Sequence, residues 1–155
     1  MKRTLLVAGS IAAAIVLVGT IVAAAGAPRL REPNTVTVIE HADTDVVVDI
    51  GKEGDSTGDV LTFHNRLYDE TDSRVVGRDQ GTCIRISPRD GTWQCSLTSI
   101  LRGGQINVEG PFYDTASSVL SVNGGTGVYR NARGTMDLFA RSEGTKFEFV
   151  FHLIP

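Results

Sequence analysis

The sequence predicts an all-β domain formed by one antiparallel sheet, preceded by an apolar N-terminal segment. Beyond residue 33, apolar and polar residues alternate with a period of two in short runs, and no run has the period of an amphipathic helix. Gly, Asp, Asn and Pro separate these runs at intervals of about 8–15 residues, as turns do in antiparallel sheets. About eight such runs occur, a number that suits a sandwich or a barrel.

The apolar segment occupies residues 1–27. Lys2 and Arg3 precede a run of apolar and small residues from Leu5 to Ala27, and charges resume at Arg29. A basic start, an apolar middle and Ala-x-Ala sites are typical of a signal peptide, whereas about 18 or more apolar residues can span a membrane. We expect a signal peptide, with an uncleaved anchor helix as the alternative. Either way the remainder is expected to be exported, and is secreted or anchored to the outer face of the cytoplasmic membrane by residues 5–27.

Residues 28–155 are expected to be one acidic domain. They number 128, enough for a single hydrophobic core. Of the chain's 15 basic residues only Lys2 and Arg3 lie in the leader, so 13 remain against 18 acidic residues, a net charge of −5. This balance argues against nucleic acid or an anionic membrane surface as a partner, and leaves the N-terminal segment as the only expected membrane contact.

The expected strands follow in order along the chain. They are NTVTVIEH (34–41), VLTFHNRLY (60–68), WQCSLTSIL (93–101), QINVEG (105–110), SSVLSV (117–122) and TKFEFVFHLI (145–154). Alternation places several large apolar side chains on one face of their strands: Leu61, Phe63, Leu67, Trp93, Phe147, Phe149 and Phe151. SPRDGTW (87–93) predicts a hairpin turn. The acid-rich stretch 42–59 predicts a solvated loop, because it lacks the residue spacing of a calcium-binding loop.

The two cysteines flank the 87–93 hairpin almost symmetrically. Cys83 and Cys95 are therefore expected on adjacent strands, and in an exported domain we expect a disulfide between them rather than two free thiols. A zinc site is not expected, because His41, His64 and His152 have no ligand spacing to either cysteine. We expect no metal and no cofactor.

The glycine-rich stretch SVNGGTGVYRNARG (121–134) could belong to a phosphate-binding loop. Gly125 and Gly127 match the first pair of a dinucleotide fingerprint, but Arg130 stands where its third glycine belongs, and no Lys-Ser or Lys-Thr pair follows. The segment VYRNARGTMDLF is strand-like, so no helix is expected to supply a dipole. The glycines are better explained by positive φ angles or by a close crossing of two backbones.

Two polar residues interrupt apolar faces. Asn65 shares a face with Leu61, Phe63 and Leu67, and Glu40 shares one with Val36 and Val38 at a strand end. A buried amide needs hydrogen-bond partners, and a charge at a strand end commonly points to solvent. Taken alone, Asn65 is explained equally well as a satisfied core asparagine or as a site residue, whereas Glu40 is better explained as a solvated residue than as a site residue.

The order of motifs resembles one barrel superfamily. GGTGVYRNARG is similar to the Gly-Gly-Thr-Gly-x-Phe-x-x-Ala-Arg-Gly hallmark of dirigent proteins, and GDVLTFHNRLYD (58–69) is similar to a segment of plant allene oxide cyclases. VVGRDQGTCI (75–84) and INVEGPF (106–112) look like further strands of the same superfamily. The resemblance covers nearly all of 34–154 and implies a closed eight-stranded antiparallel barrel with an apolar interior, commonly assembled into trimers.

The resemblance also implies site residues. In the cyclases a glutamate near the end of the first strand and the asparagine of Phe-x-Asn-x-Leu-Tyr line the cavity, and Glu40 and Asn65 match them as catalytic candidates. Cys83 matches a cysteine of the family, although Ile84 and Ile86 alternate against it and compete for the inward face. Ala42 stands where the cyclases carry a second cavity asparagine.

Two functions are compatible with these residues. In the first, the barrel binds a small apolar ligand and promotes its intramolecular cyclisation or isomerisation, with Glu40 acting on the ligand. In the second, it binds such a ligand without catalysis, as a dirigent protein or a lipocalin does. The expected cavity lining is Leu61, Phe63, Leu67, Cys83, Trp93, Phe147, Phe149 and Phe151.

Overall fold

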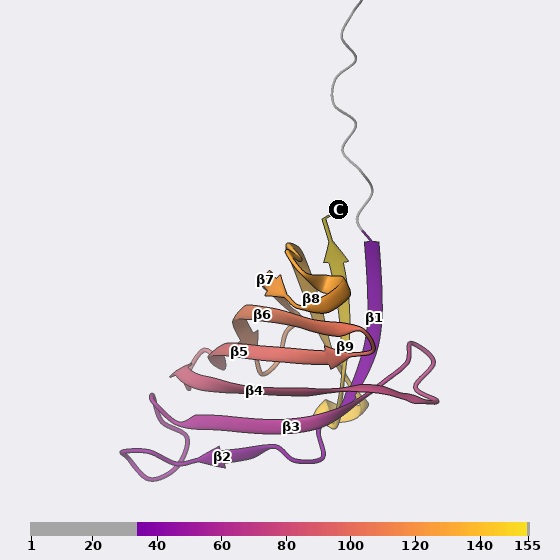
Figure 1. Cartoon of the computed structure of the whole chain (residues 1–155). Coiled ribbons are helices and arrows are strands. Elements are labelled where there is room, and N and C mark those ends of the chain that lie inside the picture. The colour runs from indigo at the N-terminus through magenta and orange to yellow at the C-terminus, as the bar shows by residue number, and fades with distance from the viewer. Residues whose placement is uncertain (1–33, 155) are drawn as a thin grey trace, which may run out of the picture. The chain divides into compact units, whose positions relative to one another are not determined.

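The computed structural model describes residues 34–154, which contain nine strands and two single-turn 3-10 helices (Figure 1). The strands are β1 (Asn34–His41), β2 (Val46–Val48), β3 (Val60–Tyr68), β4 (Val75–Ser87), β5 (Thr92–Leu101), β6 (Gly104–Tyr113), β7 (Ser118–Gly125), β8 (Gly134–Arg141) and β9 (Lys146–Leu153). The 3-10 helices are η1 (Gly127–Tyr129) and η2 (Ser142–Gly144). The N-terminal signal or anchor segment predicted for residues 1–27 lies outside the described residues. No helix within 34–154 is long and apolar enough to cross a membrane.

Eight of the described strands close into an antiparallel barrel. The order β1-β9-β8-β7-β6-β5-β4-β3 returns to β1 through pairing of β1 with β3. Closure removes the exposed edges that short strands would otherwise present. The closed eight-stranded barrel predicted from the sequence is therefore confirmed.

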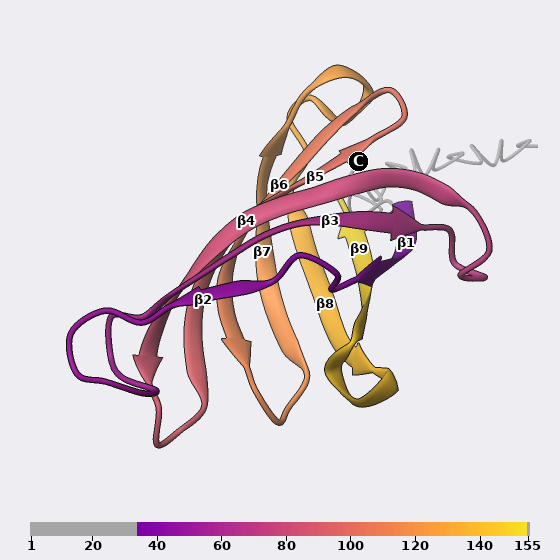
Figure 2. The same ribbon diagram turned by 90° about the horizontal axis from the view of Figure 1, so that it is seen from below.

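One edge of β3 is divided between two partners. Its first residues, Val60–Thr62, pair with β2, and its last residues, Arg66–Tyr68, pair with the end of β1. Figure 2 shows β2 running alongside β3 after the chain has left β1. The short connection 42–45 between β1 and β2 therefore lies opposite the middle of β3. This interruption in the pairing is where the polar residues of the interior gather.

The period-two patterns place the predicted side chains inside the barrel. Phe149, Phe151 and Leu67 are buried, as the alternation predicts, and Phe147 and Leu61 pack against the same core. The core is completed from β5 to β8 by Leu97, Ile106, Val108, Leu120, Val122, Met136 and Leu138. Every strand of the barrel contributes to one core because alternate residues of each strand face inward.

Two local details differ from the sequence prediction. The strand-like segment beginning at Val128 forms η1 and a turn first, and β8 begins only at Gly134, because Asn131 takes a left-handed φ of 65° that breaks a strand. The stretch 42–59, predicted to be a solvated loop, contains the short strand β2. Asp59, the last residue of this stretch, is buried. Asp59 accepts hydrogen bonds from the backbone N–H groups of Ile50 and Ser56, so its carboxylate holds the loop together from inside.

The glycine-rich stretch has the geometric role predicted for it. Gly127 has a φ of 60°, and a Cβ there would lie 2.0 Å from the carbonyl oxygen of Gly103. Gly134 has a φ of 140°, and its Cβ would lie 1.9 Å from the carbonyl oxygen of His152. These glycines let two connections cross the neighbouring backbone closely, and no phosphate cradle is formed.

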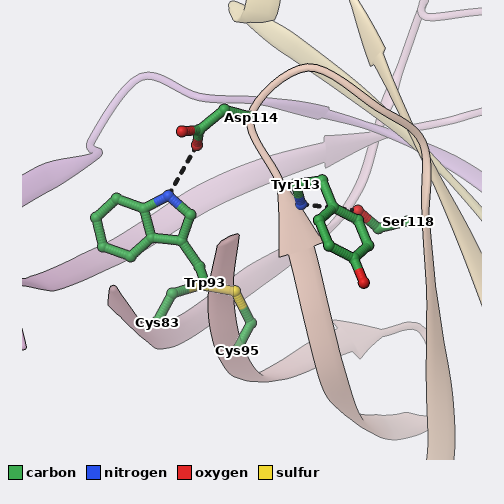
Figure 3. The surroundings of a disulfide bond; sticks show 6 residues. All are labelled: Cys83, Trp93, Cys95, Tyr113, Asp114 and Ser118. Carbon is green, nitrogen blue, oxygen red and sulfur yellow. Dashed lines mark hydrogen bonds between the residues drawn. A yellow bond between two sulfur atoms is a disulfide. The ribbon is translucent and has the colours of Figure 1, made fainter. Parts of the chain in front are cut away.

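The predicted disulfide is present. Cys83 on β4 and Cys95 on β5 are direct cross-strand partners on either side of the 87–93 hairpin, and their sulfur atoms are bonded (Figure 3). Both are buried, whereas Ile84 and Ile86 are exposed. Cys83 therefore occupies the inward face, which the sequence left open.

Candidate functional site

An apolar cavity lies inside the barrel. It contains about 430 Å³ of space outside the protein atoms, part of it continuous with solvent, of which about 50 Å³ can hold the centre of a water molecule. Its apolar wall is formed by Leu61, Phe63, Cys83, Cys95, Leu97, Phe112, Leu120, Leu138, Phe147 and Phe149. Glu40 and Asp45 complete the lining. The cavity thus suits a small apolar molecule that reaches one acidic patch.

The wall contains most but not all of the side chains predicted for it. Leu61, Phe63, Cys83, Phe147 and Phe149 line the cavity. Three further candidates lie in the core instead: Leu67 and Phe151 are fully buried, and Trp93 packs under Arg85 at the barrel end. Five residues line the cavity without having been predicted to do so: Cys95, Leu97, Phe112, Leu120 and Leu138. They lie on β5 to β8, where short runs indicated strands but gave no way to locate the cavity along them.

Glu40 brings a carboxyl group into this wall. It is the next-to-last residue of β1, is 5% exposed, and pairs in register with Leu67 of β3. Asn65 Nδ2 donates a hydrogen bond to its Oε1 over 3.0 Å. Glu40 and Asn65, the two catalytic candidates named from the sequence, are therefore in direct contact.

Asn65 is fully hydrogen-bonded inside the protein. Its Nδ2 donates to Glu40 Oε1 and, over 2.7 Å, to Asp45 Oδ1. Its Oδ1 accepts hydrogen bonds from the backbone N–H and the hydroxyl of Thr44. The three bonds to Thr44 and Asp45 hold the connection between β1 and β2 against β3, and the fourth links Asn65 to β1. In this arrangement Asn65 orients the two carboxyl groups and lies behind the cavity wall.

Asp79 is a member of the polar group that sequence reasoning missed. It lies on β4 directly opposite Asn65 and is fully buried. Ser99 on β5 donates a hydrogen bond to its Oδ1 over 2.8 Å, while its Oδ2 has no partner among the described residues. Asp79 has the same parity as Cys83 along β4, so the alternation contained the signal. Glu40, Asn65, Asp79 and Ser99 thus form a polar row across four neighbouring strands.

The surroundings favour neutral forms of the two buried acids. Burial raises the pKa of Glu40, and the carboxyl of Asp79 raises it further, whereas the hydrogen bond from Asn65 opposes this shift. Burial also raises the pKa of Asp79, against the hydrogen bond from Ser99. Desolvation destabilises a carboxylate unless a cation or several donors compensate. For Glu40 this is the direction expected of a carboxyl in an apolar cavity.

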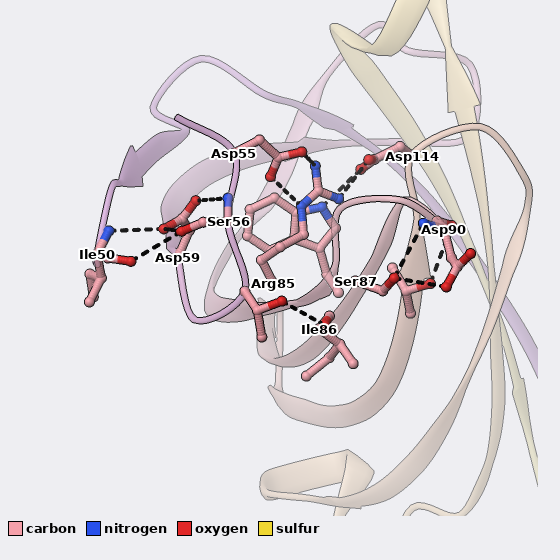
Figure 4. A network of polar contacts seen from close by, with 12 residues as sticks. Ile50, Asp55, Ser56, Asp59, Arg85, Ile86, Ser87, Asp90 and Asp114 are labelled. Carbon is pink, nitrogen blue, oxygen red and sulfur yellow. Dashed lines mark hydrogen bonds and ion pairs between the residues drawn. The ribbon is translucent and has the colours of Figure 1, made fainter. Parts of the chain in front are cut away.

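A second polar cluster fastens the 49–59 loop near the C-terminal end of β4. Arg85 donates two hydrogen bonds to Asp55, each of 2.7 Å, and one of 2.6 Å to Asp114 (Figure 4). Its guanidinium lies 4.2 Å from the centre of the Trp93 ring, and Trp93 Nε1 donates to Asp114 (Figure 3). Arg85 is fully compensated here, so we assign this cluster to holding the loop in place.

The chemistry available follows from these contacts. An apolar cavity can hold a flexible molecule in one shape, and a carboxyl in its wall can donate or accept one proton. Among residues 34–154, no group of three or more His, Cys, Asp and Glu side chains is arranged to hold a metal ion. Fold and site together define a closed β-barrel with an apolar cavity and an acidic patch in the cavity wall.

The chain belongs to the family of dirigent-like proteins, whose pattern matches residues 24–152. This match covers the barrel except for Leu153, the last residue of β9.

Solved structures support the same fold. A pyocyanin demethylase is 27% identical, with a TM-score of 0.69 over 77% of this chain and 99% of that one. The pterocarpan synthase dirigent protein PsPTS1 is 22% identical, with a TM-score of 0.63 over 80% of this chain and 97% of that one. The Diels Alderase AbmU from Streptomyces koyangensis is 16% identical, with a TM-score of 0.59 over 80% of this chain and 70% of that one.

Proposed function

We propose that the barrel binds a small apolar ligand carrying an oxygen atom and promotes an intramolecular cyclisation or isomerisation of it, with Glu40 as the acting residue. The observation that carries this proposal is the Glu40 carboxyl, buried in a cavity wall that is otherwise apolar apart from Asp45 within the described residues. A carboxyl group that is only structural gains nothing from facing an apolar cavity, because desolvation destabilises its charged form.

The rate enhancement has two sources in this proposal. Confinement in the cavity holds the reacting ends of the ligand near each other before the reaction, so less entropy is lost on reaching the transition state. Glu40 then interacts with charge or a proton that develops on the ligand, in surroundings where such an interaction is stronger than in water. Related barrels named as Diels-Alderases and as a cyclase for a [4 + 2] cycloaddition agree with ring formation inside this fold.

Binding without catalysis is the second candidate function. It is favoured by the small number of polar groups in the wall, since a dirigent protein or a lipocalin needs only shape and apolar contact. Asn65, the other catalytic candidate, uses all its hydrogen-bonding capacity within the protein. The two candidates differ in one measurable property, which is whether a bound ligand is converted.

Export also remains part of the proposal. The Cys83–Cys95 disulfide supports it, because such bonds persist in oxidising compartments. We further propose the trimer that the family resemblance implies, which sedimentation of the purified protein can test.

The deciding experiment begins with mass spectrometry of small molecules that co-purify with the full chain. Any molecule found is then incubated with the wild type and with Glu40→Gln. The variant keeps the shape and the hydrogen bond from Asn65, so ligand affinity should hardly change while conversion slows by about 10²-fold. Glu109→Gln, at an exposed glutamate of β6, serves as the matched control and should convert normally. If Glu40→Gln converts the ligand as fast as the wild type, Glu40 is not the acting residue. If no bound molecule is converted at all, the protein is a binder.

A further inference from the structure

Glu40 is not the only carboxyl group in the interior. Asp79 is 0% exposed, and its Oδ2 is a buried oxygen without a hydrogen-bond partner in the described part of the chain. Asn65 lies between the two acids, because it bonds to Glu40 and is the register partner of Asp79. Asp45, at the cavity lining, adds a third carboxyl group near the same amide.

This group of acids has no counter-cation. Within residues 34–154, no Lys, Arg or His side chain forms an ion pair with Glu40, Asp79 or Asp45. Arg66 and Arg78 form the register pair next to Asn65 and Asp79, but both side chains lie on the exposed faces of β3 and β4. His41 follows Glu40 but turns to Asp72 instead.

The remaining neighbours also carry no positive charge. Asn65 on β3 and Ser99 on β5 supply only neutral donors to the acids. Two buried carboxylates so close together and without a cation would be strongly destabilised in a low-dielectric interior. Glu40 and Asp79 therefore cannot both be ionised while they remain buried, and a proton has to be retained on this pair.

We propose that Asp79 is a positioning residue that keeps Glu40 protonated at neutral pH, so that Glu40 presents a carboxylic acid to the cavity and donates a hydrogen bond to an oxygen acceptor on an apolar ligand. Asp79 acts through the buried polar row and touches no ligand itself, since it does not line the cavity. Oε1 of Glu40 is occupied by Asn65, which leaves Oε2 as the atom that carries the proton toward the cavity.

The inference rests on the proposed function and narrows its substrate class. The ligand is expected to carry a carbonyl, ether or epoxide oxygen at one end of an apolar skeleton. In an isomerisation, the proton that Glu40 gives to this oxygen returns to Glu40 when the neutral product forms. The composition of the ligand therefore does not change, and no oxidant or reductant is needed.

Titration of the carboxyl groups tests the inference without any ligand. In the full chain with ¹³C-labelled Glu and Asp side chains, the Glu40 carbon should titrate well above the ordinary glutamate value of about 4.3. Asp79→Asn should lower this titration by about one pH unit or more, because the second acid is gone. Asp43→Asn removes an exposed charge from the 42–45 connection and should leave it nearly unchanged.

The reciprocal variant, Glu40→Gln, measures the same coupling between the two acids if Asp79→Asn fails to fold. Glu40→Gln keeps the hydrogen bond from Asn65, and it should lower the titration of Asp79, because coupling between two sites acts equally in both directions. If Glu40 titrates near its ordinary value, or if neither variant moves the partner's titration, the inference is wrong.

A pair of small probes tests what Glu40 presents to the cavity. Cyclohexanone supplies a carbonyl acceptor, whereas methylcyclohexane has a similar skeleton without one. Binding of the ketone should weaken as the pH rises through the titration of Glu40, with a lowered carbonyl stretching frequency in the bound state at neutral pH. Binding of the hydrocarbon should not depend on pH. Equal pH dependence for both probes would overturn the inference. Failure of both probes to bind, with the coupled titration intact, would instead count against the binding function proposed above.

Discussion

Asn65 on β3 donates a hydrogen bond to Glu40 on β1 at the point where the pairing between β1 and β3 ends. Beyond this point, within the described residues, β3 is unpaired on that edge until it meets β2. The amide thus has two tasks, since it orients the acid and it ties down the connection 42–45. Asn65 performs both tasks because every donor and acceptor of its side-chain amide forms a hydrogen bond within the protein. The consequences can be measured separately, as stability and as ligand recognition.

Asn65→Leu should destabilise the protein by about 1–3 kcal/mol, because it leaves Glu40, Asp45 and Thr44 without their buried partner. It should also weaken binding of the oxygenated part of a ligand while apolar contacts persist. Urea unfolding followed by circular dichroism measures the first effect. Asn123→Leu, at an exposed asparagine of β7, is the control and should change stability by less than about 0.5 kcal/mol. Equal effects of the two variants would contradict the role assigned to Asn65.

The buried acids predict a particular dependence of stability on pH. Burial raises the pKa of Glu40 to about 8 and that of Asp79 to about 7, so the folded protein holds protons that the unfolded chain has already released. This stabilisation is complete below the ordinary carboxyl pKa values of about 4 and is lost as the pH rises through the folded values.

Urea unfolding between about pH 5 and pH 9 should therefore show a falling free energy of unfolding. The fall should be smaller in Glu40→Gln and unchanged in Glu109→Gln. Stability that rises over this interval in the wild type, or a Glu40→Gln curve parallel to it, would show that Glu40 titrates normally.

The disulfide is expected to contribute strongly to stability. Cys83 and Cys95 are separated by 12 positions in sequence, and closing a loop of this length stabilises a fold by about 3 kcal/mol in the chain-entropy description. Replacing both cysteines by alanine should lower the free energy of unfolding by this order. A reducing agent should lower it in the wild type and leave the double variant unaffected. Native protein should also have a mass two units below that of the reduced form.

Arg85 should control the mobility of the 49–59 loop. Arg85→Lys cannot form the paired hydrogen bonds to Asp55 or stack as a plane on Trp93, so amides of residues 49–59 should exchange faster with solvent. Trp93 is the only tryptophan of the chain, so its fluorescence reports the same change directly. Arg89→Lys, at an exposed arginine of the adjacent hairpin, should alter neither signal. Unchanged exchange in Arg85→Lys would mean that the loop is held by its other hydrogen bonds, such as those of Asp59 and Thr57.

Two glycines with positive φ separate steric effects from backbone effects. Gly134→Ala places a Cβ against the carbonyl oxygen of His152, whereas Gly144→Ala, with a φ of 81°, meets no atom within 4 Å. Gly144→Ala should cost about 1–2 kcal/mol of stability from its φ angle alone. Gly134→Ala should cost clearly more, which thermal unfolding can show. Equal losses would imply that the crossing at Gly134 relaxes freely.

The sequence predicted most of the fold because inward and outward residues alternate on long, amphipathic strands such as β3 and β9. It could not locate β2, since Val46, Val47 and Val48 are all exposed and show no alternation. It identified Glu40 and Asn65 through motif resemblance. It missed Asp79 because a single acid in a run containing Arg78 and Gln80 resembles an exposed position, although the alternation with Cys83 along β4 places it on the inward face.

The divided edge of β3 has a consequence for how the barrel moves. Three residue pairs join β1 to β3, whereas β4 and β5 share ten. The junction between β1 and β3 is therefore the weakest strand pairing of the barrel. Thermal fluctuations should part the strands there first, since local opening begins where the fewest backbone bonds must break. Glu40 belongs to one of the three pairs. An opening between β1 and β3 that admitted a small molecule would therefore also bring water to Glu40. A bound ligand that stabilised the closed pairing would exclude water from this carboxyl group.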